Sequence, residues 1–154
     1  LRRHRFAGIR NSDIGKKALF LESEIKNSIL ELKLQNLTPH KVPTGFGGRV
    51  LELRATFFER SRVTKEKRLQ FRARFVDDKG EETLPYLATR LKKDTRLHPN
   101  ERRVLQFFIP QGTTQIKIDL LYKPISDTLK EALKITDPVF TKSYTILTKT
   151  IKAE

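Results

Sequence analysis

Short stretches of alternating hydrophobic and polar residues recur along the chain and predict a β-rich fold. The clearest alternation covers residues 69–75, where Leu69, Phe71, Ala73 and Phe75 are separated by polar residues. A period of two places successive side chains on opposite faces of a strand, so one face is expected to be buried and the other wet. Similar patterns predict strands over residues 24–37 (with one bulge), 50–57, 103–109, 115–122 and 144–151.

The segments between these strands predict two short helices and several loops. Residues 12–22 follow N-cap side chains, and residues 125–135 contain the cap pair Ser126-Asp127. Residues 38–48 include two prolines and three glycines, which predict a structured loop. We expect a longer basic loop at 60–68 and a polar crossing with little regular structure at 81–100.

The order of these elements indicates one fold class. Pro110-Gln111-Gly112 predicts a hairpin turn that pairs residues 115–122 back onto 103–109. The whole pattern is typical of a mainly β fold, an antiparallel immunoglobulin-like β-sandwich with a short N-terminal helix and a short helix near 125–135. We expect residues 1–23 to form a segment that joins a missing upstream region, and residues 24–154 to form the sandwich. The lack of methionine suggests a processed product or a piece of a longer protein.

Composition then excludes several kinds of site and points to anionic partners. The absence of cysteine rules out disulfides, thiolate metal sites and covalent haem attachment within these 154 residues. There is no signal peptide pattern and no run of ~18 apolar residues that would span a membrane. The 32 Lys and Arg against 18 Asp and Glu give a net charge of +14, which attracts acidic proteins, anionic surfaces or nucleic acid.

The residues that usually carry catalysis do not form a recognisable pattern. No two carboxylates are placed for acid–base chemistry, and Asp94 beside Lys93 and Glu101 beside Arg102 suggest charge neutralisation. We therefore expect no enzymatic activity. Basic residues are scattered and the strand aromatics face the core, so nucleic-acid binding is not expected. Taken alone, each of the three histidines is best interpreted as an ordinary loop residue.

Three stretches together resemble the C-terminal β-sandwich domain of multihaem c-type cytochromes. They are Arg-His-Arg-Phe-Ala-Gly-Ile-Arg-Asn at 3–11, Leu-Gln-Asn-Leu-Thr-Pro-His-Lys-Val-Pro-Thr-Gly at 34–45, and Asp-Thr-Arg-Leu-His-Pro-Asn-Glu-Arg-Arg at 94–103. In that family a haem-rich N-terminal region carries the Cys-x-x-Cys-His motifs, which are absent here. The family's histidines correspond to His4 and His40, so the resemblance implies that either could be a distal ligand to a haem held upstream.

The resemblance implies a non-catalytic domain of a periplasmic or cell-surface electron carrier, with haem c bound only in the intact protein. Its partners would be the upstream haem domain or a redox protein, and its basic surface would meet haem propionates, an acidic protein or an anionic lipid. The alternative is a free-standing immunoglobulin-like module for protein interaction or assembly that never contacts haem.

Overall fold

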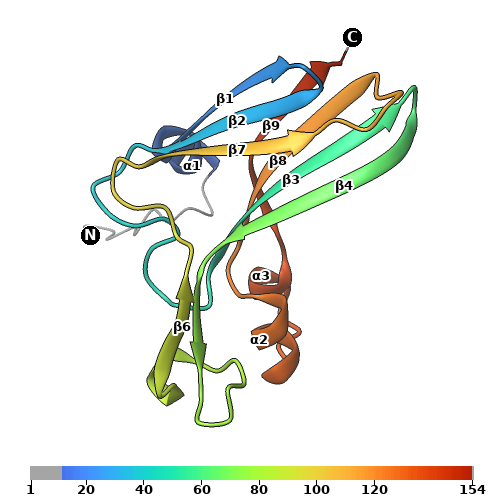
Figure 1. Ribbon diagram of the computed structural model, residues 1–154. Coiled ribbons are helices and arrows are strands. Elements are labelled where there is room, and N and C mark those ends of the chain that lie inside the picture. The colour runs from blue at the N-terminus through green and yellow to red at the C-terminus, as the bar shows by residue number, and fades with distance from the viewer. Residues whose placement is uncertain (1–11, 154) are drawn as a thin grey trace, which may run out of the picture.

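Two antiparallel sheets face each other in the computed structural model, which describes residues 12–153 (Figure 1). The first sheet has the order β1-β2-β7 and consists of β1 (Leu19–Lys26), β2 (Ile29–Asn36) and β7 (Arg102–Phe108). The second has the order β4-β3-β8-β9 and consists of β4 (Arg62–Phe71), β3 (Val50–Glu59), β8 (Gln115–Lys123) and β9 (Tyr144–Lys152). The expected mainly β sandwich is therefore confirmed.

A two-stranded arm and a few short helices complete the fold. The arm pairs β5 (Ala73–Val76) with β6 (Arg90–Asp94), and a 3-10 helix spans Pro85–Leu87 between them. The α-helices are α1 (Ser12–Ala18), α2 (Asp127–Ala132) and α3 (Pro138–Thr141). In Figure 1 the arm and the pair α2 and α3 lie together at the end of the molecule away from the β1–β2 turn.

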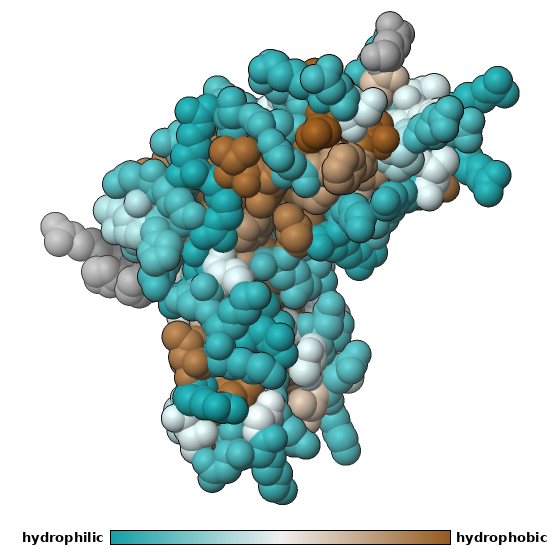
Figure 2. All heavy atoms as spheres, in the orientation of Figure 1, coloured by the Kyte–Doolittle hydropathy of each residue, from teal (hydrophilic) through white to brown (hydrophobic). Residues whose placement is uncertain are grey.

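The core lies between the two sheets and follows from strand periodicity. Leu30, Leu32 and Leu34 of β2 are fully buried, while the residues between them are half-exposed. They face buried side chains of the second sheet, including Leu53 and Ile118. Figure 2 shows that hydrophilic residues cover most of the visible face and that hydrophobic residues gather in its upper half around β7. Burial of this apolar surface is the main force that holds the sheets together.

The short helix expected over 12–22 is present but shorter, and the single strand expected over 24–37 was wrong. The helix ends at Ala18, and β1 begins at Leu19, so β1 crosses the domain boundary expected after residue 23. Residues 24–37 span a hairpin, because Asn27 and Ser28 take left-handed backbone angles (φ 49° and 62°) and reverse the chain. The apparent bulge in the apolar spacing was this two-residue turn.

Three expectations for the basic and polar segments were also wrong. Residues 60–68 contribute to β4, an edge strand exposed along its whole length until Phe71. Such a strand has no buried face to produce an alternation, and its Lys and Arg residues protect a free edge. The predicted strand over 69–75 is interrupted at Arg72, and the crossing over 81–100 contains β6.

The turn at 110–112 does not form the expected hairpin. β7 pairs with β2, whereas β8 pairs with β3 and β9, so the chain crosses from one sheet to the other. Turn residues reveal a reversal of the chain but do not determine which sheet the next strand joins. The strands predicted over 103–109, 115–122 and 144–151 are confirmed. So is the Ser126 cap, whose side chain accepts a hydrogen bond from the N–H of Leu129.

Candidate functional site

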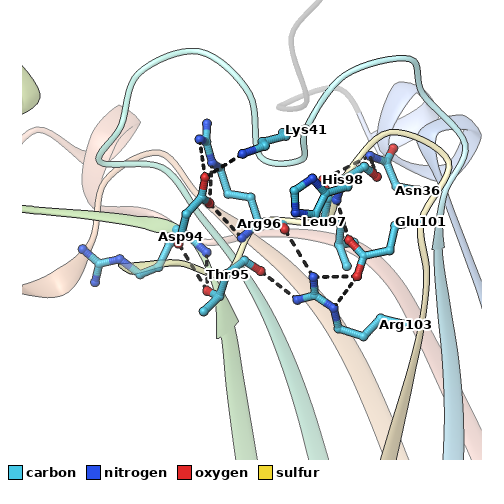
Figure 3. Close-up of polar contacts among 10 residues, drawn as sticks. Asn36, Lys41, Asp94, Thr95, Arg96, Leu97, His98, Glu101 and Arg103 are labelled. Atoms are coloured by element: carbon cyan, nitrogen blue, oxygen red, sulfur yellow. Dashed lines mark hydrogen bonds and ion pairs between the residues drawn. The ribbon is translucent and has the colours of Figure 1, made fainter. Parts of the chain in front are cut away.

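Two loops that bear histidines meet at one end of the first sheet (Figure 3). The loop after β2 carries His40, and the segment before β7 carries His98. A pair of backbone hydrogen bonds joins them, because Val42 and Leu97 each donate an N–H to the other's carbonyl at 2.9 Å. Both of these side chains are buried in the core. The two loops therefore form one connected structure above the sheet.

Asn36 is the residue that ties both histidine backbones together. It is the last residue of β2 and is fully buried. Its Nδ2 atom donates to the carbonyl oxygens of His40 at 2.7 Å and His98 at 2.8 Å, with a longer contact to that of Leu97 at 3.3 Å. Buried polar groups need such partners, so one amide satisfies carbonyls on both loops.

The imidazole of His40 is oriented by its neighbour Thr38. His40 is exposed, and its Nδ1 atom lies 3.1 Å from Oγ1 of Thr38. The same hydroxyl lies 2.7 Å from Oδ1 of Asn36, the nearest of its acceptors. A hydroxyl has one proton, so when it donates to Asn36 its oxygen accepts the Nδ1–H of His40. This arrangement leaves Nε2 of the neutral imidazole with its lone pair.

His98 is exposed as well but is held only through its backbone. Its N–H donates to Oε2 of Glu101 at 2.6 Å, and its carbonyl accepts the N–H of Glu101 at 3.1 Å. The structure gives its ring no hydrogen bond to a described residue. The two loops thus present two exposed imidazoles, of which His40 alone has a ring nitrogen engaged by a side chain.

Ion pairs fix the segment that carries His98. Asp94 accepts from Nε and Nη2 of Arg96 at 2.9 and 2.7 Å and from Nζ of Lys41 at 2.9 Å. The hydrogen bonds from Arg96, and then that from Lys41, hold the pKa of the Asp94 carboxyl well below its usual range. Lys41 follows His40 directly, so this carboxylate links the two histidine loops a second time.

Glu101 and Arg103 form the second pair of this segment. Arg103 donates from Nε to Oε1 of Glu101 at 2.7 Å and from Nη1 to the carbonyl of Thr95 at 2.8 Å, and its guanidinium stacks over Phe71. Burial alone would raise the pKa of Glu101, but hydrogen bonds from the His98 N–H and from Arg103 lower it. The partners of Asp94 and Glu101 are thus two residues ahead in the chain, and not the adjacent residues that the sequence suggested, because alternate residues of an extended segment share a face.

The structure describes one of the two site residues expected from the sequence. His40 lies on the loop just described, whereas His4 lies outside the described residues. The roles of Asn36 and Thr38 were missed, although a signal was present. Asn36 continues the buried alternation of Leu30, Leu32 and Leu34, and a polar residue at a core position of a strand requires partners.

The described residues contain no cluster of three or more His, Asp or Glu side chains that could hold a metal ion. None of the helices within residues 12–153 has the length and apolar character needed to cross a membrane.

Comparison with known proteins yields one match, to a solved structure. No protein-family model and no curated protein matches the chain. The fold is similar to the crystal structure of a penta-heme cytochrome c552 from Thermochromatium tepidum, with a TM-score of 0.84 and 24% sequence identity over 97% of this chain. The match covers 43% of that cytochrome, so this chain spans less than half of its length. The resemblance to multihaem cytochromes is thereby confirmed at the level of the fold.

Proposed function

We propose that this chain is a non-catalytic β-sandwich domain of a periplasmic or cell-surface multihaem c-type cytochrome. It supports electron transfer by packing on haems that another region carries. The observation that carries this proposal is the fold likeness to a penta-heme cytochrome over 97% of the chain. The chain has no cysteine for thioether bonds, which is compatible with haem attachment outside these residues.

The fit of the chain to a haem rests on His40. An axial ligand must offer an unprotonated ring nitrogen, and the second nitrogen of a metal-binding histidine normally donates a hydrogen bond. With its hydroxyl donating to Asn36, Thr38 would accept that bond from Nδ1, and Asn36 fixes the backbone of the loop. His40 would hold the iron of a haem through Nε2, and His4 is proposed for the same role. A bound haem would supply the one-electron chemistry of the intact protein.

The remaining surface supports a role in packing and shielding. A net charge of +14 favours contact with haem propionates, an acidic redox partner or an anionic lipid surface. A domain that excludes water from haem edges and brings positive charge near them shifts their reduction potentials. The chain would therefore tune electron transfer without carrying a redox group of its own.

A pyridine haemochrome spectrum of the native protein that contains this chain tests the proposal. We expect the α-band of c-type haem in that protein and no haem absorbance in the isolated 154-residue chain. A colourless native protein would overturn the proposal and would favour the alternative of a free-standing interaction module.

A further inference from the structure

A shallow hollow of about 380 Å³ lies where the arm joins the second sheet and α2. Its lining includes Arg72, Arg74, Lys93, Glu82 and Thr95. Neither exposed histidine lines it, and the proposed haem contact gives no role to the three cationic side chains that converge there.

The pairing of β5 with β6 forces two like charges together. Arg74 lies directly opposite Lys93 in the register. Side chains at opposite positions of an antiparallel pair share one face, and like charges placed there destabilise the pair. Arg72 is two residues before Arg74 and reaches the same face, next to Thr95, whose Oγ1 accepts the N–H of Arg72 at 3.0 Å.

The carboxylate in the hollow does not balance these charges. Glu82 contacts Nη2 of Arg72 through Oε1, and its Oε2 lies 3.8 Å from Nε of Arg74. Lys93 forms no ion pair with any residue between 12 and 153. Three cations (Arg72, Arg74 and Lys93) against the one carboxylate of Glu82 leave a net charge of 3 − 1 = +2 at the hollow.

A second carboxylate that acts on Arg72 is shared with other cations. Asp127, at the start of α2, pairs with Lys123 at 3.0 Å and with Lys130 at 3.4 Å. Asp127 raises the pKa of Arg72, but it is shared with these two lysines and so offsets only part of the positive charge of the three cations.

The burial of the charged Arg72 side chain at this position is energetically unfavourable. Its side chain is 9% exposed, and its Nε atom is buried without a hydrogen-bond partner among the described residues. Burial, and then the charge of Arg74, lower the pKa of Arg72 to about 10, so that it remains charged at neutral pH. A buried, incompletely paired cation beside two others is unfavourable unless an anion completes its environment.

We propose that this hollow is a binding site for a phosphate dianion or a phosphoryl group. A dianion matches the net charge of +2, and guanidinium groups match the geometry of phosphate oxygens. The ligand would lie between Arg74 and Lys93 and relieve their mutual repulsion. This site would bind phosphate whether or not the protein carries a haem.

Titration of the 154-residue chain with inorganic phosphate at low ionic strength tests the site. Arg74→Gln and Lys93→Gln each remove one cation and should weaken phosphate binding about tenfold. Lys92→Gln is the matched control, because it removes the same charge from the adjacent position, which does not line the hollow. Phosphate binding that is absent from the wild-type chain, or equal in all four proteins, would overturn the proposal.

Two further measurements identify the class of ligand and test the repulsion between Arg74 and Lys93. If glycerol phosphate binds more tightly than inorganic phosphate, the site is one for a phosphoryl monoester; if inorganic phosphate binds more tightly, it is one for free phosphate. Equal affinity for the dicarboxylate succinate would contradict a phosphate site. Lys93→Glu should abolish phosphate binding yet raise the melting temperature in phosphate-free buffer, because a cross-strand ion pair replaces a repulsive pair. A fall in melting temperature would contradict the postulated repulsion.

Discussion

The Nδ2 atom of Asn36 lies 2.7 Å from the backbone carbonyl oxygen of His40. Asn36 is fully buried and His40 is exposed, so a core residue determines where an exposed histidine stands. The position of His40 is therefore built into the sandwich itself and does not depend on the region that the histidine would face. Such rigidity suits a side chain that must meet a partner group in a defined place.

Asn36→Ala should destabilise the domain. The substitution leaves the carbonyls of His40 and His98 without their donor and creates a small cavity. We expect the free energy of unfolding in urea to fall by about 2–3 kcal/mol. Gln35→Ala is the control, because this neighbour on β2 points to the other face, and it should change stability by less than about 0.5 kcal/mol. Equal effects of the two substitutions would show that Asn36 does not hold the loops.

Thr38→Val should free the imidazole of His40 while preserving the shape of the side chain. The hydroxyl that accepts from Nδ1 is lost, so the ring should change from one tautomer to a mixture of two. Long-range ¹H–¹⁵N spectra report which ring nitrogen is protonated. The signals of His98 serve as the internal control and should stay unchanged. A His40 ring that is already a mixture in the wild-type chain would contradict the assigned role of Thr38.

The Asp94 ion pairs predict a specific pH dependence. The pKa of Asp94 is lower in the folded chain than its unfolded value of about 3.9, so its contribution to stability is present above that value and lost as the pH falls below about 4. Asp94→Asn should therefore lower stability at pH 7 by about 1–2 kcal/mol, limited by the solvent exposure of Lys41. The difference from the wild-type chain should shrink at pH 3.

Asp78→Asn is the matched control for this pH dependence, because Asp78 is exposed in the turn after β5. Urea midpoints at both pH values should be nearly the same for this variant and the wild-type chain. A difference for Asp94→Asn that is independent of pH would rule out its carboxylate as the cause.

Ser28→Gly should stabilise the β1–β2 hairpin. Both residues of this turn have positive φ, and Asn-Gly is the preferred pair for such a turn, whereas Ser pays a steric cost at φ 62°. We expect a gain of about 0.5–1 kcal/mol in the free energy of unfolding. Ser61→Gly makes the same change in the β3–β4 turn at a residue without positive φ and should give no gain.

Much of the fold could be predicted from the sequence where one face of a strand is buried. The apolar residues at every second position of β2, β3 and β8 are buried in the core; β3 and β8 were expected and found, whereas β2 was found as the second half of a hairpin. β6 and residues 62–68 of β4 were missed because these residues are nearly all exposed, and such a strand shows no alternation of buried and exposed positions; only residues 69–71 of β4 fell within a predicted strand. The β7–β8 connection was misread because sheet membership depends on pairing between strands that are distant in sequence.

The candidate site was predictable only in part for the same reason. The motif around His40 was visible, and the buried alternation pointed to Asn36, but the contact of Asn36 with His98 joins residues 62 positions apart. The partners Arg74 and Lys93 are brought together by the β5–β6 register, which β6's weak pattern did not reveal. Interactions between distant strands require the fold before they can be recognised.

The ferric electron paramagnetic resonance spectrum of the native protein that contains this chain would show whether the loop of His40 faces a haem, as proposed. His40→Ala should convert one low-spin haem signal to a high-spin signal, because the iron loses an axial imidazole. His98→Ala removes an equally exposed histidine from the adjoining loop and should leave the spectrum unchanged. An unchanged spectrum in His40→Ala, or the same conversion in His98→Ala, would contradict the account.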